Sequence, residues 1–181
     1  MVDSEYDYLA NILVIGDMHV GKACLLIRFV NNVFFPDHWD WPERSFVEKF
    51  EHFYEFSVKV TIWKGKGIER IATFWPMSYK NKEIIIIVFD LSRRSTFDSI
   101  DYWVAQTKNY ASKDTNFLLI GNKTDLEREV GYQEAWKKAL MLGMLYVETS
   151  AKYGHQVNYA FRSCLESLVW RIRHNYDKLV K

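Results

Sequence analysis

The sequence has few of the residues that would point to a secreted, zinc-binding or membrane-spanning protein. It contains two cysteines, Cys24 and Cys164, which lie far apart and make no disulfide or metal framework, and five histidines without paired ligand spacing. No apolar run approaches the roughly 20 residues of a transmembrane helix, and the N-terminus is acidic and polar rather than signal-like. We therefore expect a cytoplasmic protein without a zinc site.

An excess of charge of one sign is also missing. The chain has 24 basic and 23 acidic residues, so its composition gives no reason to expect nucleic acid or an anionic membrane as a partner. There are only three prolines, and there is no repeat, low-complexity run or linker. The 181 residues therefore predict a single domain over 1–181, which could be one part of a longer or tandem protein.

Short apolar runs indicate buried strands. The run at 84–89 is apolar at every position, which is typical of a central strand covered on both faces. Helical patterns alternate with the strands, except that a long loop and an antiparallel hairpin follow Asn32. The order predicts an α/β fold with a mostly parallel, six-stranded, doubly wound sheet, one antiparallel strand and about five helices. The strands are expected at 8–15, 46–53, 56–63, 84–89, 117–120 and 145–147, and helical patterns at 25–29, 97–110 and 161–172.

A glycine-rich turn follows the first strand. Residues 16–23 read Gly-Asp-Met-His-Val-Gly-Lys-Ala, which matches G-x-x-x-x-G-K. Backbone N–H groups, the helix N-terminus and Lys22 would together bind phosphates; the alternative is an ordinary strand-to-helix turn with a surface lysine. The predicted phosphate-binding residues are Gly16, His19, Val20, Gly21, Lys22, Ala23 and Cys24.

Two further loops follow strand ends. Residues 122–125 read Asn-Lys-Thr-Asp, and residues 148–152 read Glu-Thr-Ser-Ala-Lys. With the phosphate loop at the right distance and order, the chain resembles the Ras superfamily, and most closely its Rab branch, from about residue 8 to about residue 174. The resemblance implies the P-loop NTPase fold and GTP or GDP as the ligand.

The resemblance also implies how the base is held. Asp125 would accept two hydrogen bonds from guanine, which adenine cannot offer. Asn122 would tie the loops together, and the backbone N–H of Ala151 would meet the guanine carbonyl. The predicted base-binding residues are Phe34, Asn122, Lys123, Asp125, Ser150, Ala151 and Lys152.

Several residues that the family uses for metal binding and hydrolysis are replaced. Ala23 and Trp41 stand where the family has hydroxyl ligands of magnesium, Lys64 where it has an aspartate, and Ile68 where a glutamine positions water. We therefore expect no catalytic residue and slow or absent GTP hydrolysis. Whether GTP or GDP binds together with magnesium stays open. Lys64 and Gly67 are further candidates for phosphate contact; the alternative for Lys64 is that its side chain points to solvent.

Aromatic residues suggest where partners bind. Phe46, Trp63 and Trp75 fall where the resemblance places effector or regulator contacts. The given chain ends without the C-terminal cysteines on which Rab proteins are prenylated, so either it is cut or it lacks this anchor. We expect a cytoplasmic protein that could lie peripherally on endomembranes through partners.

Three functions remain open at this stage. The first is a guanine-nucleotide-binding regulator of the Rab type that acts in vesicle traffic and is slow or inert as an enzyme. The second is a nucleotide-free pseudo-GTPase that acts as an interaction module. The third, an efficient GTPase, would need Asp17 or Asp40 as a substitute metal ligand.

Overall fold

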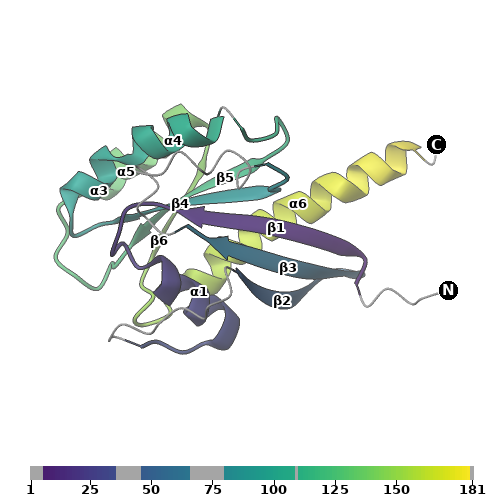
Figure 1. Cartoon of the computed structure of the whole chain (residues 1–181), viewed down its shortest axis with the longest axis horizontal. Helices are drawn as coiled ribbons and strands as arrows, with labels where there is room; N and C mark the ends of the chain where they lie inside the picture. The colour runs from purple at the N-terminus through teal and green to yellow at the C-terminus, as the bar shows by residue number, and fades with distance from the viewer. Residues whose placement is uncertain (1–5, 36–45, 66–79, 109, 180–181) are drawn as a thin grey trace.

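A six-stranded sheet forms the middle layer of the protein (Figure 1). The structure is a computed structural model that describes residues 6–35, 46–65, 80–108 and 110–179, with side chains up to residue 174. The strand order is β2-β3-β1-β4-β5-β6; β2 and β3 are antiparallel, and all other neighbours are parallel. The predicted sheet is therefore confirmed. Its strands are β1 (Tyr8–Ile15), β2 (Phe46–Phe53), β3 (Phe56–Lys64), β4 (Ile84–Asp90), β5 (Asn116–Asn122) and β6 (Leu145–Thr149).

Helices cover both faces of the sheet. In Figure 1, α1 and α6 lie on one face, and α3, α4 and α5 lie on the other. Phe29 of α1 and Phe161 of α6 stack in the first layer, with ring centroids 4.4 Å apart, while Trp103 of α4 is buried in the second. The five helices of the described chain are α1 (Lys22–Asn31), α3 (Arg94–Asp98), α4 (Ile100–Lys108), α5 (Tyr132–Leu142) and α6 (Val157–Leu179).

The central strand β4 is buried along its whole length. Because successive side chains of a strand point to opposite faces, Ile84 and Ile86 join the apolar cluster under α1 and α6. Ile85 and Ile87 join the cluster under α3, α4 and α5. This explains why every position of the strand is apolar rather than alternate positions only.

The structure corrects one helix prediction. The apolar pattern at 97–110 predicts one helix, but two helices occur, and Ser99 lies between α3 and α4. Tyr110 lies beyond the end of α4, where its N–H donates to the carbonyl oxygen of Thr107 in a turn at 3.0 Å. The Ser99 hydroxyl donates to Asp17 on the phosphate loop at 2.8 Å, so the break between the helices contacts the candidate site.

The carboxyl ends of the parallel strands meet at one edge of the sheet. Asp90, Asn122 and Thr149, on β4, β5 and β6, are paired in register across this edge. The chain passes from β3 on one side of β1 to β4 on the other, so the strand order reverses beside β1. Such reversal points open a crevice at the carboxyl ends of the strands, where ligands of doubly wound sheets bind.

Some predictions fall outside the described residues: those on Trp41, Gly67, Ile68, Trp75 and the alternative ligand Asp40. They remain predictions. Among the described helices, none is long and apolar enough to cross a membrane.

Candidate functional site

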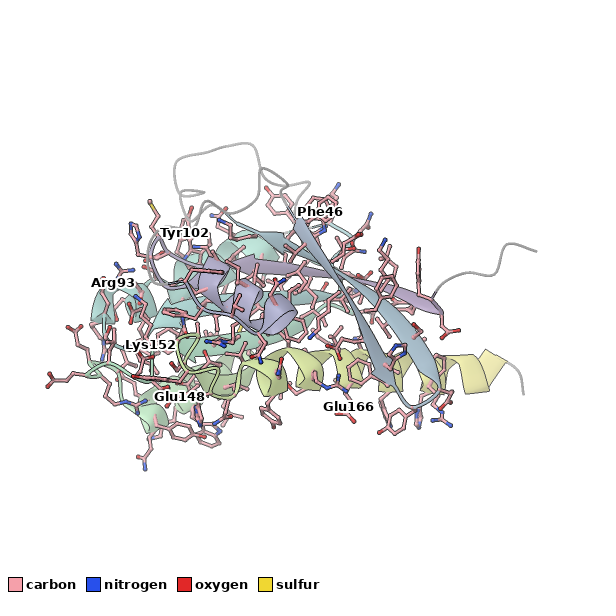
Figure 2. All side chains as sticks on the ribbon, turned by 90° about the horizontal axis from the view of Figure 1, so that it is seen from below. Phe46, Arg93, Tyr102, Glu148, Lys152 and Glu166 are labelled. Carbon is pink, nitrogen blue, oxygen red and sulfur yellow. The ribbon has the colours of Figure 1, made fainter. Side chains whose placement is uncertain are left out.

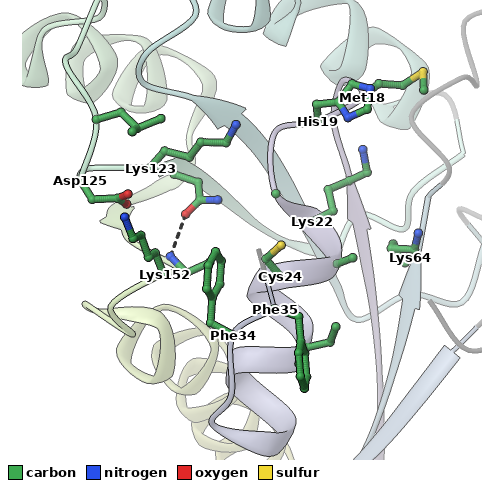
Figure 3. Close-up of a pocket in the computed structure, with 16 residues that line it drawn as sticks. Met18, His19, Lys22, Cys24, Phe34, Phe35, Lys64, Lys123, Asp125 and Lys152 are labelled. Atoms are coloured by element: carbon green, nitrogen blue, oxygen red, sulfur yellow. Dashed lines mark hydrogen bonds between the residues drawn. The ribbon is translucent and has the colours of Figure 1, made fainter. Parts of the chain in front are cut away.

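A cavity of about 630 Å³ lies at this edge of the sheet (Figure 3). It brings together most of the predicted site residues: His19, Gly21, Lys22, Ala23, Cys24, Phe34, Lys64, Asn122, Lys123, Asp125, Ala151 and Lys152. Gly16, Val20 and Ser150 are buried and do not line the cavity. Met18, Ile27, Phe35 and Leu126 complete the lining, and none of these four was among the predicted site residues.

The glycine-rich turn surrounds the ammonium group of Lys22. Gly16 and Gly21 have φ of 136° and 92°, a region that glycine enters at little cost. Lys22 begins α1 and is only 5% exposed, and its Nζ donates to the carbonyl oxygens of Gly16 at 2.8 Å and Asp17 at 2.6 Å. The turn therefore presents a positive charge next to the N-terminus of a helix, an arrangement suited to phosphate.

Three residues that the sequence did not single out hold this turn against α3 and α4. The Asp17 carboxylate accepts hydrogen bonds from Ser99 Oγ at 2.8 Å and Trp103 Nε1 at 2.9 Å. Arg93 donates to the carbonyl oxygen of Met18 at 2.6 Å. Because the Asp17 carboxylate faces these helices and does not line the cavity, the structure gives no support to Asp17 as a substitute metal ligand.

Asn122 connects the loops around the cavity. Its side chain is fully buried, and its Nδ2 donates to the carbonyl oxygen of Val20 on the phosphate loop at 2.9 Å. Its Oδ1 accepts from Thr149 Oγ1 at 3.0 Å and from the backbone N–H of Ala151 at 3.2 Å, the contact drawn in Figure 3. One amide therefore joins the loops after β1, β5 and β6 into a single wall.

A carboxylate is oriented at the other end of the cavity. Asp125 is half-buried, and its Oδ1 accepts a hydrogen bond from Ser150 Oγ at 2.5 Å. Ser150 itself is buried and also accepts from the backbone N–H of Tyr153 at 3.2 Å. This support fixes the direction of the carboxylate, which can then accept hydrogen bonds from a ligand.

Lys123 is held by an ion pair beneath the cavity. Its Nζ lies 2.7 Å from Asp90 Oδ2 at the end of β4. Burial alone would raise the pKa of Asp90, but hydrogen bonds from Lys123 and Ser92 outweigh this and keep the pKa below its usual value. Asp90 therefore stays ionised and fixes the position of the Lys123 side chain along the cavity.

Arg28 holds the loop after β6 against α1. Its Nε donates to the carbonyl oxygen of Ala151 at 2.9 Å, and its Nη2 donates to that of Lys152 at 2.7 Å. No local pattern indicates this role, because the partners of Arg28 lie more than 120 positions away in the chain. Arg28 thus positions two residues of the cavity wall without lining the cavity itself.

The side chains at the phosphate end do not fit a magnesium ion. Mg²⁺ prefers oxygen ligands, yet Ala23 has no side-chain oxygen and Lys64 brings a positive charge. Burial raises the pKa of the neighbouring Cys24 thiol despite the opposing charge of Lys123, so Cys24 stays neutral and is a poor ligand for a hard cation. Among the described lining residues, side-chain oxygens occur only on Asn122, the last residue of β5, and on Asp125 in the loop that follows it.

Comparisons with known proteins agree with this geometry. Residues 11–169 match the model of the Ras family. The chain is 32% identical to Ras-related protein Rab-19 of Xenopus laevis, over 96% of this chain and 83% of that protein. It is 34% identical to Ras-related protein RABD2a of Arabidopsis thaliana, over 94% and 85%, and 33% identical to Ras-related protein Rab-4 of Dictyostelium discoideum, over 91% and 82%. The family implies a guanine nucleotide as ligand. The chain therefore belongs to the Ras family and is a Rab-like small GTPase.

Proposed function

We propose that this protein is a guanine-nucleotide-binding regulator of the Rab type that hydrolyses GTP slowly or not at all. One observation carries the proposal: the oriented carboxylate of Asp125 and the buried ammonium group of Lys22 line the same cavity. Their chemistry suits the two ends of a guanine nucleotide, with the base at Asp125 and the phosphates at Lys22.

The remaining wall suits the rest of the ligand. Phe34 lines the cavity and offers an aromatic edge to the base, with Lys152 on the same side in Figure 3. The backbone N–H of Ala151 is held by Asn122 at 3.2 Å, which is the long end of the hydrogen-bond range. When the nucleotide binds, this N–H can therefore donate to a base carbonyl in addition to Asn122 Oδ1, or in place of it.

Slow hydrolysis follows from the chemistry of the phosphate end. Phosphoryl transfer relies on a metal ion that neutralises developing charge and on a side chain that orients water. Ala23 and Lys64 supply neither an oxygen ligand nor a base there, and Ile68 stands at the position where the family has its glutamine. We therefore expect the protein to hold GTP or GDP without rapid turnover.

The antiparallel hairpin of β2 and β3 suits contact with effector or regulator proteins. Phe46 and Trp63 face each other across β2 and β3, with ring centroids 4.8 Å apart. In Figure 2, Phe46 lies well apart from Lys152, which marks the base side of the cavity. A partner bound at the hairpin of β2 and β3 would leave the base side of the cavity accessible. By similarity to Rab proteins, we propose a role in vesicle traffic, with location on endomembranes through such partners.

Analysis of the bound nucleotide tests this proposal against the alternative of a nucleotide-free interaction module. Purified protein is denatured by heat, and the released material is separated by HPLC. We expect GDP or GTP in near-stoichiometric amount, because the cavity is preformed. Protein that carries no nucleotide and takes up none on incubation would instead support the interaction module. A single-turnover assay with bound GTP should then release little phosphate over hours, whereas release within minutes would contradict slow hydrolysis.

A further inference from the structure

We propose that the ammonium group of Lys64 takes the place of a divalent cation at the phosphate end of the cavity, so that the nucleotide binds without magnesium. This inference rests on the proposed function, because it concerns the phosphates of the same ligand. It follows from the charge of the cavity wall, from the position of Lys64, and from the oxygen atoms that are already engaged.

The cavity wall is positive. Lys22, Lys64, Lys123 and Lys152 line it, and Asp125 is the one acidic residue of the described lining. Asp90 behind the wall pairs with Lys123, which leaves a formal excess of two positive charges. A nucleoside diphosphate or triphosphate is a polyanion, and its phosphates repel one another unless cations lie close by. The lysines of the wall therefore supply positive charge that a bound metal ion would otherwise supply to the phosphates.

The sheet places Lys64 beside the phosphate loop. Lys64 ends β3 and pairs in register with Val14 of β1, two residues before Gly16. The next residue, Gly65, donates its N–H to the carbonyl oxygen of Val14 at 2.8 Å, so the backbone on both sides of the side chain is fixed. Figure 3 shows Lys22 and Lys64 at the same end of the cavity.

Backbone oxygens of the phosphate loop are already engaged. The carbonyl oxygens of Gly16 and Asp17 accept from Lys22, that of Met18 accepts from Arg93, and that of Val20 accepts from Asn122. A magnesium ion would therefore have to rely on phosphate and water oxygens, next to a lysine that repels it. An ammonium group has no such difficulty, because it donates hydrogen bonds directly to phosphate oxygens.

Two lysines can thus share the phosphates. Lys22 reaches them from the N-terminus of α1, and Lys64 reaches them from the end of β3. The four-carbon side chain of Lys64 is half-buried, so its charge is only partly screened by water. Affinity for the nucleotide should therefore depend on Lys64 and be almost independent of magnesium.

The test is the affinity of nucleotide-stripped protein for GDP and GTP, measured by calorimetry in excess magnesium and in excess EDTA. Wild-type affinity should differ by no more than about twofold between the two conditions. Lys64→Ala should weaken both ligands about tenfold or more in EDTA, which corresponds to about 1.4 kcal/mol. Guanosine, which lacks phosphates, should bind wild type and Lys64→Ala equally well.

Matched variants separate the charge from other effects. Lys137→Ala removes an exposed lysine on α5, outside the cavity, and should leave all affinities unchanged. Lys64→Arg should retain most of the GDP affinity, since it keeps a positive donor. The thermal midpoint of each variant shows whether the fold is intact.

The inference is overturned if EDTA weakens wild-type binding tenfold or more, or if Lys64→Ala binds GDP as wild type does while folded. If neither GDP nor guanosine binds, the proposed function fails together with this inference. Restoring oxygen ligands offers an independent check: the double variant Ala23→Ser, Lys64→Asp should become sensitive to EDTA. A double variant that binds GDP equally well with and without magnesium would also count against the inference.

Discussion

Replacing Asp125 with asparagine should weaken GDP binding about 100-fold or more and shift the preference of the protein toward xanthosine diphosphate. In the proposed complex the carboxylate accepts two N–H donors of guanine, and hydrogen bonds to a charged group contribute about 1.5–3 kcal/mol each. The NH2 group of asparagine would face the guanine amine, and two hydrogen-bond donors repel each other. Xanthine has a carbonyl at that position, which can accept from the amide.

Competition against a fluorescent nucleotide measures this change, with GDP, xanthosine diphosphate and ADP added to wild type and variant. Asp114→Asn is the matched control, since Asp114 lies in an exposed turn outside the cavity and its change should have no effect. Asparagine keeps an Oδ1 atom that can accept the hydrogen bond that Ser150 Oγ donates to Asp125 at 2.5 Å, so the fold should persist. An Asp125→Asn variant that still prefers GDP would place the base elsewhere.

Gly16→Ala should destabilise the protein by more than about 4 kcal/mol, or prevent it from folding. A Cβ atom at this position would lie 2.1 Å from the backbone carbonyl oxygen of Val88, and the φ of 136° is itself unfavourable for alanine. Relief requires the phosphate loop to move away from β4, since a backbone oxygen at the centre of the sheet cannot rotate aside.

Urea denaturation in the absence of nucleotide measures this loss without the contribution of a bound ligand. Gly131→Ala is the control, because no atom lies within 4 Å of its added Cβ and its φ is −71°. We expect that variant to stay within about 1 kcal/mol of wild type. Equal stabilities for the two variants would mean that the phosphate loop does not pack on β4 as described.

The strands could be predicted because buried strands appear in the sequence as short runs of apolar residues. Each of the six expected strands occurs within a few residues of its predicted limits, including the hairpin of β2 and β3. By contrast, no local pattern predicted α5. Its buried positions are Ala135 and Ala139, while Tyr132, Trp136 and Leu140 are exposed. A search for large apolar residues therefore follows the solvent face of this helix and misses its buried face.

The candidate site divides in the same way. Residues in short motifs, such as Lys22 and Asp125, could be found because neighbours in sequence share one loop. The supports at Arg28, Arg93 and Trp103 could not, since their partners lie 75 to 124 positions away. Only the folded sheet brings such pairs together, and no local pattern marks them.

Calorimetric titration of nucleotide-stripped wild-type protein with GDP and with ADP tests most directly whether the cavity binds a guanine nucleotide. We expect GDP to bind with a stoichiometry near one and at least about 100-fold more tightly than ADP, because only guanine offers two N–H donors to Asp125. Equal affinities for GDP and ADP, or no binding of either, would contradict this expectation.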